Sequence, residues 1–516
     1  SAADLLANDT IDGGEGTDTL TVEATSYADE SVFAGVSNVE KIKPIAADGV
    51  TQAITFNGNI DTTTFDLSDD SNAALTFKAG YTNATTVELG LDIGSNTDSV
   101  INGGALNANI DLTVTALDAD SIDGTTTITG GTGTDTISIT NFATGGTATL
   151  TNATYIDVLN VIDYVNGADV TLTLGTNGAV STPLTINATS LDAGEILTVA
   201  GAASLGALTI NAGAGADILT GGNVNDIIVG GAGIDTIDGR ENSATAGADN
   251  ISGGAGNDII NVTVAETEFS NSSSTALVTD TVDGGAGTDT LAFAPVVTLT
   301  KAELGNISNV EKLTLANTST ITLSDDFLTN NPGVSITLAA GTISAGAGTT
   351  ADPTVTLPVS YTAGSGDIKI TTGTGDDTFN TASSLLINST DTIDGGTGTD
   401  TINVFNEGTF GTTNTTGDAV TLALDIYHTN IEKVTIVDAA VDDNAGDVTI
   451  TIAAAYTGTA LEIDATSLDQ NALTAGNNES LTLTQAAADT AAITLTSGAG
   501  ADIITSGAGN DILTTG

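Results

Sequence analysis

Aspartate and glycine recur in one nine-residue pattern, Gly-Gly-x-Gly-x-Asp-x-(large apolar)-x, which carries the clearest chemistry in the sequence. Full matches span 13–21, 130–138, 230–238, 253–261, 284–292 and 395–403, and segments 212–220, 221–229, 372–380, 497–505 and 506–514 miss it at one position. Glycine reaches positive φ without steric cost, so the first six residues predict a tight turn. The last three predict a short strand with one inward apolar side chain.

Contiguous units place their aspartates in columns. Segment 212–238 holds three units without a gap, so Asp217, Asp226 and Asp235 lie nine residues apart. Two units would make one turn of a flattened coil. Asp217 and Asp235 would then lie on one edge and share an ion, while Asp226 faces the opposite edge.

Stacked carboxylates require a cation between them. Two carboxylates about 5 Å apart repel by roughly 3 kcal/mol at an effective dielectric of about 20. Oxygen-only ligands in flexible number, from carboxylates and turn carbonyls, suit Ca²⁺ better than Mg²⁺ or a transition metal. We therefore predict multiple Ca²⁺ ions between the turns.

The predicted metal ligands are the aspartates and glycines of these turns. The aspartates are Asp9, Asp18, Asp135, Asp217, Asp226, Asp235, Asp249, Asp258, Asp280, Asp289, Asp377, Asp391, Asp400, Asp502 and Asp511. The glycines are Gly213, Gly215, Gly231, Gly233, Gly254, Gly256, Gly285, Gly287, Gly396 and Gly398. The lone units at 130–138 and 372–380 stay open between a calcium site and a plain turn.

Short strands must position these turns. Thr-rich runs such as 112–115, 171–174, 448–451 and 481–484 alternate strictly between apolar and polar residues, which indicates half-buried strands. No long segment has a helical period. The predicted fold class is all-β: an elongated β-solenoid in which parallel β-roll segments stack with Thr-rich β modules, with calcium ions between turns.

Longer repeats divide the chain into modules. The block Ser-Asn-Val-Glu-Lys-Ile at 37–42 returns at 308–313 and in altered form at 429–434, and the block at 186–192 returns at 463–469. We predict four β modules. They span 1–119, with an N-terminal unit, 120–279, ending in the stack 212–261, 280–390, and 391–516, ending in the stack 497–514.

The composition excludes several classes of protein. Eight basic and 65 acidic residues give a formal net charge of −57, which repels nucleic acid and anionic membranes, and no apolar run is long enough for membrane insertion. One histidine and no cysteine exclude zinc fingers, iron–sulfur sites and thiol catalysis. No Gly-x-Ser-x-Gly elbow is present, so no catalytic residues are predicted and we expect no enzyme.

The nonapeptides resemble the RTX family, whose calcium-binding repeats form parallel β-rolls on proteins exported by type I secretion. The interleaved blocks resemble RTX-type S-layer proteins of Gram-negative bacteria. This resemblance implies an extracellular subunit of a calcium-dependent S-layer on the bacterial cell surface. Its partners would be copies of itself in a two-dimensional lattice, and cell-surface polysaccharide through a region outside this chain. The alternative is a calcium-stiffened segment of a secreted adhesin or biofilm-matrix fibre.

Overall fold

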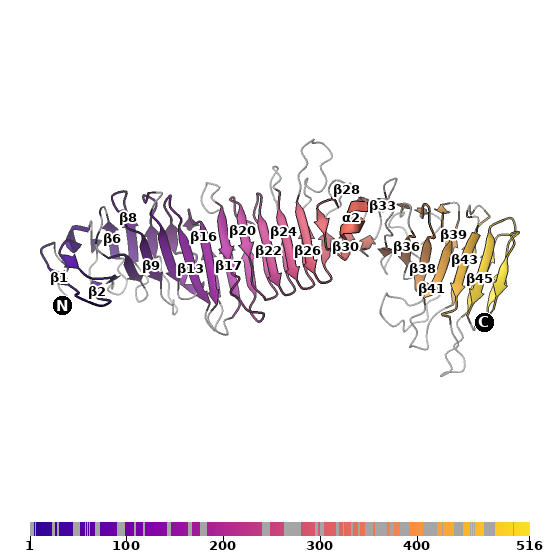
Figure 1. Ribbon diagram of the computed structural model, residues 1–516, viewed down its shortest axis with the longest axis horizontal. Coiled ribbons are helices and arrows are strands. Elements are labelled where there is room, and N and C mark those ends of the chain that lie inside the picture. Colours follow the sequence, from indigo (N-terminus) through magenta and orange to yellow (C-terminus); the bar gives the residue numbers. More distant parts are fainter. Residues whose placement is uncertain are drawn as a thin grey trace. The chain divides into compact units, whose positions relative to one another are not determined.

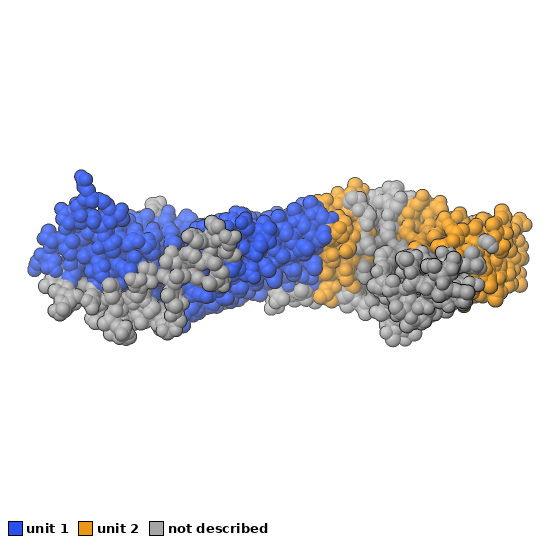
Figure 2. Space-filling model, turned by 90° about the horizontal axis from the view of Figure 1, so that it is seen from below, with its two compact units in different colours: residues 1–266, 278–287 blue, residues 267–277, 288–516 orange. Residues whose placement is uncertain are grey.

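The protein forms two compact units of stacked parallel strands. The computed structural model describes residues 5, 7–22, 26–27, 30–44, 52–56, 58, 60, 62–67, 73–89, 99–107, 110–116, 119–141, 146–163, 168–175, 183–239, 248–262, 280–294, 298–299, 304–315, 319–323, 325–331, 334–338, 341–345, 354–356, 369–371, 376–381, 392–405, 420–425, 427–437, 447–454, 456, 458, 460–468, 480–498 and 500–515. Unit 1 comprises Ser1–Glu266 and Val278–Gly287, and unit 2 comprises Thr267–Leu277 and Thr288–Gly516 (Figure 2). The division into four modules stays a prediction.

The longest sheet of unit 1, sheet I, holds one strand from each successive rung. Its strands, in order, are β2 (Thr19–Val22), β5 (Lys41–Pro44), β7 (Thr64–Leu67), β9 (Thr85–Leu89), β11 (Leu112–Ala116), β13 (Thr136–Asn141), β16 (Val158–Asp163), β18 (Leu184–Asn187), β20 (Leu208–Asn211), β22 (Ile227–Ala232), β24 (Asn250–Ala255) and β26 (Thr281–Ala286). All of these neighbours pair in parallel. Figure 1 shows its later strands side by side.

Two further sheets cover sheet I in succession along the chain. Sheet II runs in the order β15 (Ala153–Thr154), β12 (Thr127–Thr129), β10 (Val100–Asn102), β8 (Ala73–Phe77), β6 (Gln52–Phe56) and β3 (Ser26–Tyr27). Sheet III runs β14 (Gly146–Leu150), β17 (Val170–Leu174), β19 (Leu197–Ala200), β21 (Ile218–Thr220), β23 (Thr236–Asp238) and β25 (Ile259–Val262). The pair β1 (Ile11–Asp12) and β4 (Val36–Ser37), and the short 3-10 helices η1 (Glu30–Phe33) and η2 (Ala119–Ser121), complete unit 1.

The core of unit 1 is a ladder of like apolar side chains. Ile186, Ile210, Ile228, Ile251 and Val282 occupy equivalent positions on consecutive strands of sheet I, and each is at most 6% exposed. Burying a side chain of this size contributes about 1.5–3 kcal/mol. Branched residues suit this arrangement because they pack closely on a pleated surface.

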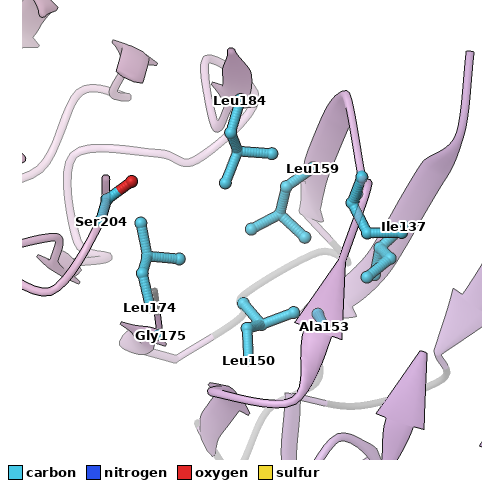
Figure 3. A pocket seen from close by; sticks show the side chains of 9 residues that line it. Ile137, Leu150, Ala153, Leu159, Leu174, Gly175, Leu184 and Ser204 are labelled. Carbon is cyan, nitrogen blue, oxygen red and sulfur yellow. The ribbon is translucent and has the colours of Figure 1, made fainter. Parts of the chain in front are cut away.

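The change from sheet II to sheet III leaves a small apolar cavity of about 20 Å³. Leu150 of β14, Ala153 of β15 and Leu174 of β17 line it together with other apolar side chains (Figure 3). A cavity with this lining offers almost no hydrogen-bonding partners, so it is a packing defect at the junction of two sheets and not a polar binding site.

Unit 2 repeats the same architecture. Sheet IV runs β27 (Thr290–Phe293), β30 (Lys312–Leu315), β32 (Ser335–Leu338), β34 (Thr354–Thr356), β36 (Thr378–Thr381), β38 (Thr401–Phe405), β41 (Lys433–Val437), β43 (Ala460–Ala465), β45 (Ala492–Ser497) and β47 (Ile512–Thr514). Sheet V runs β28 (Thr298–Leu299), β31 (Ser319–Leu323), β33 (Gly341–Ala345), β35 (Lys369–Thr371), β37 (Thr392–Asp394) and β40 (His428–Thr429). Sheet VI runs β39 (Val420–Leu424), β42 (Val448–Ile452), β44 (Leu481–Gln485) and β46 (Ile503–Thr505). The two-residue strand β29 (Ile307–Ser308) and the six-residue helix α2 (Asp325–Asn330) also belong to this unit.

The predicted all-β class with stacked parallel strands is confirmed. The four alternating runs named from the sequence are strands β11, β17, β42 and β44, and in each the apolar residues are buried. The longest helix among the described residues, α2, has six residues. The solenoid therefore consists of short strands joined by turns, and the aspartates of the nonapeptides lie in those turns.

Candidate calcium sites

The aspartates of the nonapeptides form two separate ladders in unit 1. Ile218 lies opposite Thr236 in the pairing of β21 with β23, so one turn of the coil takes 18 residues here. The first ladder (Asp217, Asp235 and Asp258) follows the turns from sheet I to sheet III. The second ladder (Asp226, Asp249 and Asp280) follows the turns from sheet III back to sheet I. The predicted placement of Asp217 and Asp235 on one edge and Asp226 on the other is confirmed.

Each ladder is held by hydrogen bonds from main chain to carboxylate. The N–H of Asp217 donates to Oδ1 of Asp235 at 2.8 Å, and the N–H of Asp235 donates to Oδ1 of Asp258 at 2.8 Å. In the second ladder Asp226 donates to Asp249 at 2.7 Å, and Asp249 donates to Asp280 at 2.8 Å. A carboxylate therefore bonds the equivalent residue of the preceding rung and fixes the distance between rungs.

The turns fall into two conformational classes. In the first class, the open turns, the second and fourth residues of the pattern are glycines with φ between 86° and 155°. These glycines are Gly14, Gly16, Gly231, Gly233, Gly254, Gly256, Gly285, Gly287, Gly396 and Gly398. The open turns leave one aspartate oxygen unsatisfied: Oδ2 of Asp18, Asp235 and Asp400 is buried and accepts no hydrogen bond.

In the second class, the closed turns, the aspartate is satisfied by its own turn. Oδ2 of Asp135 accepts the N–H of Gly131 at 2.6 Å, and its Oδ1 accepts the N–H of Leu112 at 2.8 Å. Oδ2 of Asp217 likewise accepts the N–H of Gly213 at 3.2 Å. Asp226 bonds the N–H of Gly222 in the same way. Gly213 and Gly215 therefore lack the positive φ that their open-turn counterparts have.

Within unit 1, the closed turns at Gly131 and Gly213 differ from the open turns at Gly231 and Gly254 in what the preceding rung places against them. A Cβ on Gly131 would lie 2.8 Å from the Cβ of Leu106, and a Cβ on Gly213 would lie 2.8 Å from the Cβ of Leu191. Each closed turn thus packs beneath a larger side chain. Gly231 instead packs against the carbonyl of Gly213, and Gly254 against that of Gly231. These two open turns are stacked on main chain and not beneath a larger side chain.

Burial and mutual repulsion raise the pKa of two open-turn aspartates, Asp235 and Asp400, and so disfavour their charged state. Burial raises the pKa of Asp235 to about 7, and the charges of Asp217 and Asp258 add to this, although the N–H of Asp217 opposes it. Burial also raises the pKa of Asp400 to about 7, with further repulsion from Asp377, Glu432 and Asp376. Because Asp235 and Asp400 are fully buried, a cation at each turn is the group that would compensate them.

The other predicted ligands differ in their setting. Oδ1 of Asp502 accepts the N–H of Leu481 at 3.0 Å, and Oδ1 of Asp511 accepts the N–H of Ile493 at 2.9 Å. Asp9 is exposed, whereas Asp289 and Asp377 are buried. Asp391 lies outside the described residues. Which of these aspartates binds an ion stays a prediction.

Sequence reasoning missed four acidic residues, each of which accepts the N–H of a nonapeptide aspartate from the rung before it. The N–H of Asp18 donates to Glu40 at 2.8 Å, that of Asp289 to Glu311 at 2.7 Å, and that of Asp400 to Glu432 at 2.9 Å. Asp157 accepts the N–H of Asp135 in the same way at 2.8 Å. The three glutamates belong to the Asn-Val-Glu-Lys block. Their position one rung beyond a pattern aspartate was the signal available in the sequence.

In two of the three copies of this block, the lysine forms an ion pair with a glutamate of a later rung. Nζ of Lys41 lies 2.6 Å from Glu88, and Nζ of Lys433 lies 2.9 Å from Glu462. The asparagine of the block adopts a left-handed conformation, with φ of 51° at Asn38. The block is therefore a structural rung that closes a glycine stack.

The residues present fit calcium. Open turns combine a buried, unsatisfied carboxylate oxygen with main-chain carbonyls, which is a hard, oxygen-only donor set. Within the described part of the chain, no group of three or more Asp, Glu or His side chains converges on a single point. Each ion would therefore take at most one or two carboxylates, and carbonyl oxygens and water would supply the remaining ligands.

Comparison with known proteins agrees with this donor set. The family model for the RTX calcium-binding nonapeptide repeat matches residues 6–24, 209–237, 243–262, 279–292, 388–403 and 494–516. No curated protein and no solved structure matches the chain. Such repeats are typical of secreted proteins exported by type I systems. In the described residues, no helix has the length and apolar character needed to cross a membrane. The nonapeptide segments of this chain match the RTX repeat, and repeats of this kind bind Ca²⁺ at multiple sites.

Proposed function

We propose that the protein is a structural component of the bacterial cell surface, a subunit of a calcium-dependent S-layer exported by type I secretion. The observation that carries this proposal is the burial of aspartates at the open turns. Asp235 and Asp400 are fully buried, and the Oδ2 atom of each accepts no hydrogen bond. Calcium at these turns would join successive rungs into a rigid scaffold. Extracellular calcium is concentrated enough to fill sites of modest affinity.

A scaffold accounts for the described features better than an enzyme does. The cavity at the junction of sheets II and III is apolar and about 20 Å³ in volume, too small for a substrate. The single histidine, His428, is fully buried, and its Nδ1 lies 3.1 Å from Oδ1 of Asp425. This pair belongs to a turn and supports a structural role for the histidine.

The proposed partners are further copies of the chain. A net charge of −57 makes subunits repel one another, and bridging calcium ions would remove that barrier. Attachment to cell-surface polysaccharide is proposed for a region outside this chain. The acidic surface therefore makes assembly conditional on divalent cations.

Electron microscopy of the purified protein in millimolar Ca²⁺ and in excess EGTA tests this function. We expect ordered two-dimensional sheets with calcium and dispersed particles after chelation, at matched ionic strength. Single rods that never form sheets would refute the lattice role and favour the adhesin or biofilm-fibre alternative. Sheets that persist in EGTA would refute the calcium dependence.

A further inference from the structure

Two acidic residues outside the nonapeptide repeats lie at the same edge as the first ladder. Asp163 is the last residue of β16 in sheet I. Glu195 precedes β19 by two residues, on the next rung, because β16 pairs with β18. Both residues therefore lie where the chain passes from sheet I to sheet III, as Asp217 does one rung later.

Each carboxylate has one buried oxygen that is unsatisfied, although Asp163 as a whole is only half-buried. Glu195 is only 3% exposed, and its Oε2 accepts the N–H of Asp192 at 2.9 Å. Oε1 of Glu195 is buried and accepts no hydrogen bond, and the same is true of Oδ1 of Asp163. Two unsatisfied carboxylate oxygens, one from each of two adjacent rungs, are thus present at one edge.

The two carboxyl groups also interact with each other. Burial is the largest cause that raises the pKa of Glu195, and the Asp163 carboxyl and the charge of Asp192 raise it further. The nearby hydroxyl of Ser190 donates to the carbonyl of Val161 at 3.0 Å, so it is engaged elsewhere. Among the described residues, no lysine, arginine or histidine forms an ion pair with Asp163 or Glu195.

We propose that Asp163 and Glu195 hold one Ca²⁺ ion between two rungs that lack the nonapeptide pattern. Two carboxylate oxygens with no donor between them attract a hard divalent cation, and main-chain carbonyls and water complete its ligands. This ion continues the first ladder beyond its glycine turns. It fastens the rung of β18 and β19, on which the turn at 212–217 is built.

The sequence offers a natural contrast to this site. The block at 186–192 recurs at 463–469, but Ala472 stands where the first copy has Glu195. The glutamate is therefore not a requirement of the repeated block itself. A carboxylate buried in one copy and dispensable in the other points to a local function, and metal binding is the one that its unsatisfied oxygen supports.

Calcium counting on the full chain tests the site. Bound Ca²⁺ per chain is measured by equilibrium dialysis and atomic absorption for the wild type, Glu195→Gln, Asp163→Asn and the double variant. The control is Asp169→Asn, which removes one charge from an exposed residue of the neighbouring rung that bonds the N–H of Ile196 at 2.9 Å. Circular dichroism in Ca²⁺ first checks that each variant folds, and the ions are counted on every variant that does.

The expected results separate metal binding from a shared proton. Each single variant should bind one ion fewer than the wild type, the double variant should also lose one ion and not two, and the control should keep the full number. A wild-type count in Glu195→Gln and Asp163→Asn would overturn the proposal, because the two acids would then share a proton. This outcome leaves the S-layer proposal unaffected, since the nonapeptide sites would still bind calcium.

Discussion

Replacing Asp235 with Asn should change stability in opposite directions with and without calcium. Asp235 is fully buried, and its Oδ2 accepts no hydrogen bond. Asn has nearly the same shape and keeps an oxygen for the N–H of Asp217, which lies 2.8 Å from Oδ1. The substitution removes the charge that a bound Ca²⁺ would balance. It should therefore stabilise the calcium-free protein and weaken the calcium-loaded one.

The gain without calcium follows from the raised pKa. Asp235 has a pKa of about 7 in the fold against an ordinary value of 3.8. Between these values the folded chain binds more protons than the unfolded chain, so calcium-free stability falls as the pH rises from about 4 to about 7 and then levels off. Ionising the buried carboxyl above that range costs about 4 kcal/mol. Asp235→Asn should recover up to that amount at about pH 8, and less than half of it at about pH 5.

The loss with calcium comes from the ligand set. Removing a charged contact to the ion should cost about 1.5–3 kcal/mol, which corresponds to a roughly 10- to 100-fold weaker calcium affinity at that turn. Urea unfolding followed by circular dichroism, in EGTA and in excess Ca²⁺, measures both effects on the same protein. A calcium titration gives the affinity directly.

Asp217→Asn is the matched control because Asp217 lies on the same ladder in a closed turn. Its two oxygens accept the N–H groups of Leu197 and Gly213, at 2.7 and 3.2 Å, and an amide nitrogen cannot replace the second acceptor. In EGTA, Asp235→Asn should therefore be more stabilising than Asp217→Asn by at least about 1 kcal/mol. Equal effects of the two variants in both buffers would refute the distinction between open and closed turns.

Three other predictions concern the same rungs. Calcium affinity should fall as the pH is lowered from about 8 to about 6, because protons compete with calcium for open-turn carboxylates such as Asp400, whose pKa is about 7. Calcium titrations at the two pH values measure this change. Gly256→Ala should lower the free energy of unfolding by more than about 1 kcal/mol, because φ there is 149° and the new Cβ would overlap a carbonyl oxygen. Gly194→Ala is the control: a Cβ there meets no atom, so thermal melts should show a nearly neutral effect. Glu432→Ala should cost about 1–3 kcal/mol by leaving the N–H of Asp400 without its acceptor, and Glu432→Gln should restore most of this in urea unfolding.

The strands and the core of the solenoid follow directly from the sequence. Leu219, Ile228 and Ile237, the expected inward residues of segment 212–238, are all at most 1% exposed. Nine-residue spacing also predicts the 18-residue turn seen between Ile218 and Thr236. These features are local or strictly periodic. Alternation of apolar and polar residues fixes which side of a strand is buried, and a repeat fixes which residues stack.

The state of each turn does not follow from its own nine residues. The unit at 130–138 matches the pattern fully, yet its turn is closed and both oxygens of Asp135 accept main-chain hydrogen bonds. The difference lies in Leu106, which belongs to the preceding rung about 25 residues earlier and covers Gly131. The pair of Asp163 and Glu195 could not be predicted from the sequence for a similar reason. Neither residue belongs to a repeated motif, and only the fold places their two rungs next to each other.

The interleaved blocks have roles that depend on their order along the chain. Leu191 and Leu468 occupy the same position in the two copies of the Ala-Thr-Ser-Leu-Asp block, and each packs against the second residue of the following nonapeptide, Gly213 or Gly498. This block therefore begins a glycine stack by covering its first turn. The Asn-Val-Glu-Lys block does the opposite, because its glutamate accepts the N–H of the last aspartate in a stack. The nonapeptides at 212–292 have one block on each side, a rung that covers the first turn and a rung that satisfies the last aspartate, so the number of stacked turns there is set by how many nonapeptides lie between the two blocks.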